Sequence, residues 1–325
     1  MTLTYAIRVH EAGGPEVLSW EEGEVGEPAA GQALIRQHAV GLNYIDVYHR
    51  TGLYPQQMPF TPGVEAAGVV EAIGPGVTTV RPGDRVAYAG PIGGYAEARL
   101  IDADRLVKLR DEISFAQAAA MMLQGMTVRM LLRAVHEVKA GDTILVHAAA
   151  GGVGVIMCQW ASAIGATVIG TVSTDEKAEL AHAHGCHHPI VYTRQDFVTE
   201  VERITGGAKL PVVYDSVGRD TFLKSLDCLR PRGLMVSFGN ASGPPDPIRP
   251  TLLAQKGSLF LTRPTLFHYI ATRDELEQSA AELFEMVLSG KVSIEIGQRF
   301  ALKDAAAAHR ALEGRETTGS TVLTV

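Results

Sequence analysis

Residues 143–174 contain the sequence feature that most constrains the fold, an apolar strand followed by a loop of small residues, a helix and a second strand. The strand Thr143–Ala148 leads into AAGGVG at Ala149–Gly154. Glycines at such a loop allow a tight turn, close approach of the backbone to a pyrophosphate, and close packing of helix on strand. The N–H groups at the start of the following helix favour an anion. The segment therefore predicts a dinucleotide-binding site.

Two other interpretations of this loop stay open. Ala149 occupies the first glycine position of the usual G-x-G-x-x-G, and small residues also serve simple helix–sheet packing. Methyltransferases also place a glycine loop after a strand, but they generally carry an acidic residue at the end of the second strand, where this chain has none. The strand–loop–helix–strand setting favours dinucleotide binding over both.

The end of the second strand indicates which dinucleotide is bound. An NAD site usually has Asp or Glu about 20 residues after the loop, where it binds the ribose 2′-hydroxyl. Here the strand Ala166–Val172 runs into Ser173 and Thr174, with no acidic residue before Asp175, and Lys177 follows within one helical turn. Hydroxyls and a cation suit a 2′-phosphate, so NADPH is the expected cofactor. In the alternative interpretation Ser173 is a helix cap and Lys177 a solvated charge.

Strand and helix patterns alternate through the middle of the chain, which predicts a doubly wound parallel sheet with helices on both faces. A long helix, Ser114–Val135, is expected before the first strand, with Ser114 as its cap. The expected strands are Thr143–Ala148, Ala166–Val172, Pro189–Tyr192, Pro211–Ser216, Gly233–Phe238 and Ser258–Arg263.

Roughly the first 120 residues have a different pattern, short strands between Gly- and Pro-rich turns, which predicts a β-barrel-like unit. A helix near 273–289, a strand near 299–302, a helix at 303–312 and a last strand do not continue the alternation, so they are expected to rejoin this unit. The expected domains are residues 1–122 with 265–325, and residues 123–264. Strands of the first unit are expected in Leu3–Arg8, Gln32–Leu42, Gly63–Ile73, Arg85–Ala89 and Tyr95–Ile101.

Composition excludes several classes of protein. The 325 residues carry a formal net charge of −7 with no basic block, which argues against a nucleic-acid partner. Cys158, Cys186 and Cys228 lie far apart, so neither a disulfide framework nor a cysteine zinc site is expected. The chain has no secretory signal pattern and no apolar stretch of about 18 residues. A cytoplasmic protein without a membrane span is expected.

Several motifs together resemble a known family. Pro62–Tyr88 (PGVEAAGVVEAIGPGVTTVRPGDRVAY) is similar to the N-terminal signature of medium-chain dehydrogenases/reductases, and Ala148–Gly154 is similar to their nucleotide loop. Gly41–Pro55 (GLNYIDVYHRTGLYP), Tyr214–Gly218 (YDSVG) and Ser237–Gly243 (SFGNASG) resemble the zeta-crystallin-like NADPH:quinone oxidoreductases. The resemblance implies a Rossmann domain, a GroES-like catalytic domain, bound NADPH, and a homodimer formed through the sixth strand.

Comparison with zinc-dependent relatives implies that no metal is bound. Those relatives have a cysteine and a histidine ligand where this chain has Asn43 and Val64, and a further cysteine near Gln124. A catalytic zinc needs three protein ligands, which these residue types do not supply. A cluster of histidines on the second helix of the nucleotide domain is expected to lie on the surface without metal. It comprises His182, His184, His187 and His188.

The family positions also imply roles for individual residues. Asn43 is expected near the nicotinamide and the substrate oxygen, and Asp46 orients the loop or a ribose hydroxyl. Tyr48 and Tyr54 are expected to flank a planar substrate. Structural alternatives remain: an Asx turn for Asn43, a buried structural partner for Asp46, and ordinary packing for the tyrosines. The expected cofactor contacts are Asn43, Asp46, Thr127, Gly151, Gly152, Val153, Ser173, Thr174, Lys177, Tyr192, Ser216, Phe238, Gly239, Asn240, Leu261, Thr262, Arg263 and Arg315.

Three functions are compatible with these features. Without a metal to stabilise an alkoxide, hydride transfer to an electron-poor conjugated acceptor is favoured over alcohol oxidation. The first function is therefore an NADPH-dependent quinone reductase, and the second is a reductase of conjugated enals or enones. The third is a non-catalytic nucleotide- or RNA-binding protein, against which the net charge argues. No proton donor stands out, so solvent is expected to deliver the proton.

Overall fold

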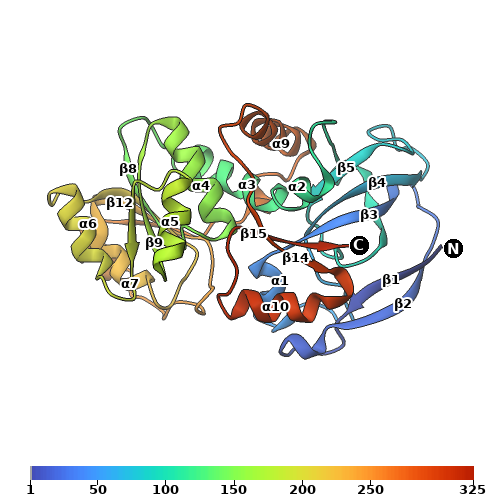
Figure 1. The fold of residues 1–325 in the computed structure, drawn as a ribbon, viewed down its shortest axis with the longest axis horizontal. Helices are drawn as coiled ribbons and strands as arrows, with labels where there is room; N and C mark the ends of the chain where they lie inside the picture. The colour runs from blue at the N-terminus through green and yellow to red at the C-terminus, as the bar shows by residue number, and fades with distance from the viewer. Residues whose placement is uncertain (1) are drawn as a thin grey trace. The chain divides into compact units, whose positions relative to one another are not determined.

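The computed structural model describes residues 2–325, and the chain divides into two compact units (Figure 1). Unit 1 comprises Met1–Met126, Ile270–Phe284 and Ile294–Val325. Unit 2 comprises Thr127–Tyr269 and Glu285–Ser293. Both units are therefore discontinuous in sequence. The chain returns to unit 1 at Ile270, after the sheet of unit 2 is complete, and Glu285–Ser293 belong to unit 2 again.

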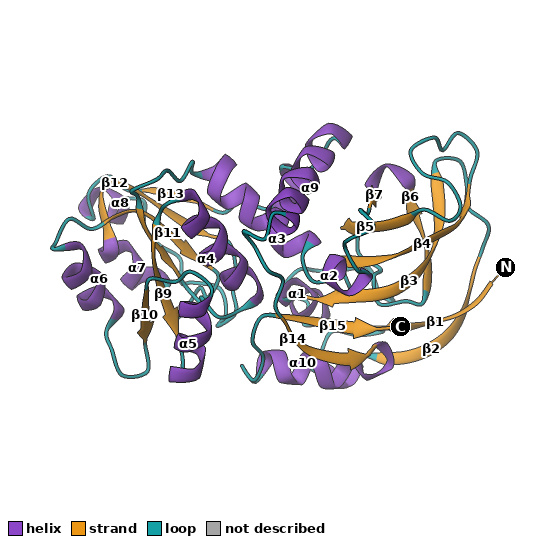
Figure 2. Cartoon of the chain, turned by 45° about the horizontal axis from the view of Figure 1, so that its top comes forward, coloured by secondary structure: helices purple, strands orange, loops and turns teal. Residues whose placement is uncertain are grey.

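Unit 2 is built on a six-stranded parallel sheet with the order β10-β9-β8-β11-β12-β13. The order reverses between β8 and β11, which is where such sheets bind ligands at the carboxyl ends of their strands. Figure 2 shows helices on both sides of the sheet, with α4 and α5 on one side and α6 and α7 on the other. The predicted doubly wound α/β fold is confirmed. The strands are β8 (Thr143–Val146), β9 (Thr167–Val172), β10 (His188–Val191), β11 (Leu210–Asp215), β12 (Leu229–Ser237) and β13 (Phe260–Thr262).

The helices of unit 2 follow from local sequence signals. Helix α4 (Gly152–Ile164) ends at Gly165, whose φ of 95° is readily adopted only by glycine. Asp196 caps α6 (Phe197–Thr205) by accepting hydrogen bonds from Val198 N and Thr199 N. Apolar side chains from the strands, α6 and α7 form one buried core. The remaining helices are α5 (Asp175–Ala183), α7 (Phe222–Ser225) and α8 (Thr251–Gln255).

Unit 1 contains a seven-stranded sheet with the order β14-β15-β3-β4-β5-β7, in which β6 also pairs with β3, and a separate β1-β2 ribbon. The last strand of the chain, β15, lies beside β3, so the C-terminal segment completes the sheet begun by the N-terminal one. Its strands are β1 (Thr2–Arg8), β2 (Ser19–Val25), β3 (Gln32–Leu42), β4 (Glu65–Ile73), β5 (Arg85–Ala89), β6 (Ala98–Asp102), β7 (Val107–Lys108), β14 (Ile296–Ala301) and β15 (Ser320–Thr324).

Several local predictions outside the parallel sheet need correction. The long helix expected over 114–135 is divided into α2 (Phe115–Ala119), α3 (Met122–Arg129) and a π-helical turn at Met130–Val135, although Ser114 caps α2 as predicted. The strand expected from Tyr95 begins only at Ala98. Strand β2 and the short helix α1 (Tyr44–Arg50) were not expected, because neither shows a clear apolar period. The other helices are α9 (Arg273–Leu288) and α10 (Ala305–Glu313).

Candidate functional site

The glycine loop of unit 2 forms the open N-terminus of α4. Gly151 is the cap residue, and its N–H donates to Ala148 O at 2.9 Å. A Cβ at Gly154 would lie 2.3 Å from Ala148 O and 2.7 Å from Ala149 C, so close helix–strand packing requires glycine there. A Cβ at Gly151 would meet only Ala148 O, at 3.3 Å, so protein packing scarcely requires glycine at this position. The N–H groups of the first turn of a helix lack intrahelical acceptors and favour an anion, so the loop has the chemistry that a pyrophosphate site requires.

A buried histidine just before the loop is hydrogen-bonded through both of its ring nitrogens. His147, the last polar side chain before the loop, lies 2.8 Å from Thr171 Oγ1 through Nδ1 and 2.8 Å from Ser225 Oγ through Nε2. Ser225 Oγ donates to Thr221 O, so it accepts from His147 Nε2, which leaves Nδ1 to accept from Thr171. Burial lowers the pKa of His147, which keeps it neutral. No local sequence signal pointed to this residue, although it is a polar residue directly after the apolar strand β8.

The end of β9 places the expected 2′-phosphate residues at the start of α5. Thr174 caps this helix, with Oγ1 accepting from Lys177 N at 3.3 Å, so the cap is Thr174 and not Ser173. Asp175 forms an exposed two-contact ion pair with Arg194, which lies just after β10. The nearby carboxylate is thus paired with a cation. Arg194 was not identified from the sequence, because only the parallel sheet places β10 beside β9.

The other predicted contacts of unit 2 lie at the carboxyl ends of the remaining strands. Tyr192 N donates to Val172 O at 3.0 Å, which places the end of β10 beside that of β9. Ser216 follows β11, and its carbonyl accepts from Ala241 N in the segment that contains Phe238, Gly239 and Asn240. Leu261 and Thr262 lie in β13. Arg263 follows them and donates to Ser237 O at 2.8 Å, and Thr127 lies half-buried in α3.

In unit 1 the side chain of Asn43 is held by two buried partners. Asn43 precedes α1, and its Nδ2 donates to Glu65 Oε2 at 2.8 Å. Gln124 Nε2 donates to Asn43 Oδ1 at 3.1 Å, and Ser320 Oγ lies 2.7 Å from Gln124 Oε1. All four side chains are buried. The loop residue Asn43 is therefore one member of a chain of hydrogen bonds that joins α1, β4, α3 and β15.

Two buried carboxyl groups flank Asn43. Asp46 Oδ2 accepts from Asn43 N at 2.9 Å and from Tyr95 Oη at 3.1 Å, and Asp46 Oδ1 has no partner among residues 2–325. Burial raises the pKa of Asp46 to about 7, and these donors offset part of the rise. Burial likewise raises the pKa of Glu65 to about 8, against the N–H donors of Asn43 and Leu123. Neither carboxyl group has a cationic partner within the described chain.

The residues around Asn43 do not fit a zinc ion. The amide groups of Asn43 and Gln124 are engaged with each other and with Glu65, and Val64 is apolar and buried. Within residues 2–325 no group of three or more metal-binding side chains of the His, Cys, Asp or Glu type occurs. The predicted histidine cluster does not lie on one helix, because only His182 belongs to α5, His184 caps its end and His188 begins β10. His182, His184 and His187 are each bonded to a different backbone group, at Cys186, Leu180 and Val168. The residue types at Asn43, Val64 and Gln124 therefore suit hydrogen bonding and packing, and not zinc.

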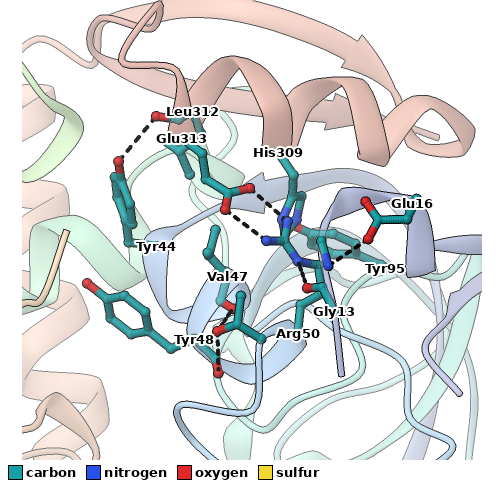
Figure 3. A network of polar contacts seen from close by, with 12 residues as sticks. Gly13, Glu16, Tyr44, Val47, Tyr48, Arg50, Tyr95, His309, Leu312 and Glu313 are labelled. Atoms are coloured by element: carbon teal, nitrogen blue, oxygen red, sulfur yellow. Dashed lines mark hydrogen bonds and ion pairs between the residues drawn. The ribbon is translucent and has the colours of Figure 1, made fainter. Parts of the chain in front are cut away.

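A buried arginine anchors α1 to α10 (Figure 3). Arg50, 1% exposed, donates to both oxygens of Glu313 at 2.8 Å, to Gly13 O at 3.0 Å and to His309 Nδ1 at 3.1 Å. Because arginine only donates, His309 carries its hydrogen on Nε2 and donates to Tyr95 Oη. Tyr95 in turn donates to Asp46. The network fixes α1, and with it the position of Asp46.

Helix α1 also carries a group of aromatic side chains. Tyr48 is buried and meets Tyr54 edge to face with ring centroids 5.2 Å apart. Tyr44, which the sequence analysis did not name, lies 6.1 Å from Tyr48 and donates to Leu312 O at 3.2 Å (Figure 3). The predicted substrate-flanking pair is thus a contacting pair in the structure. Arg315 lies exposed in the turn after α10 with a φ of 61°.

Comparisons with known proteins agree with this architecture. The model of the alcohol dehydrogenase GroES-like domain matches residues 29–111, and that of zinc-binding dehydrogenases matches residues 152–286. Quinone oxidoreductase of Pseudomonas aeruginosa is 53% identical over 96% of each chain. A 2-haloacrylate reductase of a Burkholderia species is 48% identical over 99% of each chain. The crystal structure of Escherichia coli quinone oxidoreductase with NADPH has a TM-score of 0.97 at 48% identity, covering 99% of this chain and 100% of that one.

The parallel sheet with its glycine loop and the GroES-like unit together define the class of medium-chain dehydrogenases/reductases. Within this class, the chain belongs to the zeta-crystallin-like NADPH:quinone oxidoreductase family. The resemblance found in the sequence is confirmed.

Proposed function

We propose that this protein is an NADPH-dependent quinone reductase that transfers hydride directly to its substrate without zinc. The Asn43 site carries the proposal: it offers an amide donor where zinc-dependent relatives have metal ligands, and no set of described residues there suits a metal. Such a site can bind a carbonyl oxygen but cannot act as a Lewis acid on an alcohol. The quinone oxidoreductase names of the relatives and the NADPH complex of the E. coli enzyme support it.

The residues of the chain would then bind and orient the reactants. The N–H groups of Gly152 and Val153 would bind the pyrophosphate, and Ser173, Thr174 and Lys177 the 2′-phosphate. The remaining contacts would be those at the strand ends of unit 2, together with Thr127 and Arg315. NADPH, when bound, supplies the hydride.

Asn43 would donate a hydrogen bond to the acceptor oxygen, with Tyr48 and Tyr54 flanking the ring. The product anion is delocalised, so solvent can protonate it after the transfer.

A reductase of conjugated enals or enones is the second candidate. It uses the same chemistry, and the 48% identical relative named 2-haloacrylate reductase favours it specifically. The two functions differ in the shape of the acceptor, so the relative kcat/KM for a quinone and a 2-alkenal decides between them.

We further propose a homodimer in the cytoplasm, with residues 1–122 and 265–325 acting as the catalytic domain and residues 123–264 as the nucleotide domain. Strand β13 supports the dimer, because it is an edge strand on which Phe260 is 62% and Leu261 40% exposed. Among residues 2–325, no helix combines the length and apolarity that crossing a bilayer requires.

Initial-rate measurements at 340 nm test the proposed function. NADPH should be consumed with 1,4-benzoquinone, NADH should react much more slowly, and a chelator should change neither rate. Alcohol oxidation that a chelator inhibits would disprove the zinc-free mechanism. Tight, salt-sensitive retention of RNA on a filter would instead support the non-catalytic alternative.

A further inference from the structure

The buried polar chain Glu65–Asn43–Gln124–Ser320 has a direction. Glu65 accepts at both oxygens, from Leu123 N at Oε1 (2.8 Å) and from Asn43 Nδ2 at Oε2 (2.8 Å). With its nitrogen toward Glu65, Asn43 presents Oδ1 to Gln124, which must then present Nε2 to it and Oε1 to Ser320. Each amide in the chain can be oriented in only one way while Glu65 accepts.

The opposite direction is also geometrically possible. Ser320 Oγ lies 2.9 Å from Ala120 O as well as 2.7 Å from Gln124 Oε1, so its hydroxyl can donate to either. If the residue at 65 donated to Asn43, both amides would turn over, and Ser320 would accept from Gln124 and donate to Ala120. The four side chains would still have partners, but the Asn43 oxygen would turn away from the backbone N–H of Asp46, with which it forms the capping box of α1. Among the four side chains, Glu65 selects the first direction when it is ionised, because a carboxylate can only accept, and its pKa of about 8 places this ionisation near pH 8.

The direction matters because it decides whether the remaining position of the Asn43 amide is a hydrogen-bond donor or an acceptor. One hydrogen of Nδ2 is used by Glu65, and among residues 2–325 the second hydrogen has no acceptor. Reversal of the amide would replace that donor by an oxygen lone pair at the same place. A substrate carbonyl oxygen that is attracted by the first arrangement is repelled by the second.

We propose that Glu65 is a positioning residue, which together with Gln124 orients the amide of Asn43 so that its spare N–H donates to the acceptor oxygen as hydride arrives. The inference rests on the proposed function and adds to it the residue that sets donor polarity. A donor of this kind stabilises the charge that develops on oxygen, so its loss should lower kcat by ~100-fold.

The main test compares Glu65→Gln with the double variant Glu65→Gln/Gln124→Glu. In the single variant the new amide keeps its oxygen toward Leu123 N and points its nitrogen at Asn43, which reverses the chain. The double variant keeps one buried carboxyl group but moves it to the other side of Asn43, so the chain is again reversed. At pH 9, where Glu65 is ionised, both should lose ~100-fold in kcat relative to the wild type with 1,4-benzoquinone, while the Kd for NADPH stays within ~2-fold.

A third comparison shows whether Glu65 acts through Asn43. Asn43→Ala alone should lose ~100-fold in kcat, and adding Glu65→Gln to it should cost less than ~2-fold more. Glu71→Gln is the matched control, since Glu71 lies on the same strand and pairs with Arg36 at the surface. Thermal melts of all variants separate loss of folding from loss of orientation.

Recovery of activity in the double variant would overturn the proposal, because charge and not direction would then matter. A loss of kcat below ~3-fold in Glu65→Gln would also overturn it. The same holds if adding Glu65→Gln to Asn43→Ala lowers kcat by as much as Glu65→Gln does alone. If the single variant does not fold, the double variant, which retains the buried carboxyl group, tests the direction of the chain by itself. A wild-type protein that binds NADPH but reduces neither quinone nor 2-alkenal would instead disprove the proposed function itself.

Discussion

Alanine substitutions at Gly151 and Gly154 should separate the two uses of glycine in the nucleotide loop. At Gly154 the added Cβ would lie 2.3 Å from Ala148 O and 2.7 Å from Ala149 C, both backbone atoms that cannot rotate away. Overpacking of this kind costs about 1–3 kcal/mol, and the higher helix propensity of alanine offsets less than about 1 kcal/mol of it. Gly154→Ala should therefore destabilise the protein with or without cofactor.

Gly151→Ala should leave the free protein nearly unchanged and impair cofactor binding. Its Cβ would meet only Ala148 O, at 3.3 Å, so a shift of a few tenths of an ångström suffices. The same Cβ would occupy the approach of the pyrophosphate, and we expect a ~100-fold weaker Kd, equivalent to about 2.7 kcal/mol. At an NADPH concentration 100 times the wild-type Kd, the cofactor should stabilise the wild type by about 2.7 kcal/mol and the variant by only about 0.4 kcal/mol.

Melting curves with and without NADPH measure both effects. At roughly 2 °C per kcal/mol, NADPH should raise the wild-type Tm by about 5 °C and that of Gly151→Ala by less than about 1 °C. A full NADPH shift in Gly151→Ala would refute the placement of the pyrophosphate, and an unchanged Tm in Gly154→Ala would refute the packing argument.

Three further predictions concern the cofactor, the Arg50 network and the buried acids. Lys177→Glu should weaken the binding of NADPH far more than that of NADH, measured as the Kd of each cofactor. An equal increase in both Kd values would show that Lys177 does not bind the 2′-phosphate. Arg50→Met should lower the free energy of unfolding, measured in urea, by about 3 kcal/mol, because the buried partners of Arg50 lose their hydrogen-bond donor. Glu313→Gln changes a partner whose side chain is one-third exposed, so it should lower the free energy of unfolding by less than about 1 kcal/mol. The pKa of Asp46 rises from 3.8 in the unfolded chain to about 7 in the folded protein, and that of Glu65 rises from 4.5 to about 8. Between the unfolded and the folded pKa of each group, the folded state therefore binds more protons than the unfolded state. Stability should therefore be greatest below the unfolded pKa values and fall as the pH rises toward 8, less steeply in Glu65→Gln; a rising curve would contradict this.

Local pattern explains why much of unit 2 was predictable. An apolar strand, a small-residue loop and a helix are signals within a few residues of each other, and their repetition leaves a parallel sheet as the economical arrangement. The cap at Ser114 is local in the same sense. The long helix over 114–135 failed because its Ala- and Met-rich composition suits both one helix and several short ones, and tertiary packing decides where it breaks.

The sequence by itself determined the fold class, the glycine loop and the types of residue at the positions where zinc-dependent relatives bind metal, because these depend on neighbours along the chain. Only the tertiary structure decided which polar groups meet. Gln124 reaches Asn43 across 81 positions, Ser320 reaches Gln124 across 196, and Arg50 reaches Glu313 across 263. A single buried polar residue has no period and no local partner, so its role appears only when folding removes water and leaves one distant group to satisfy it.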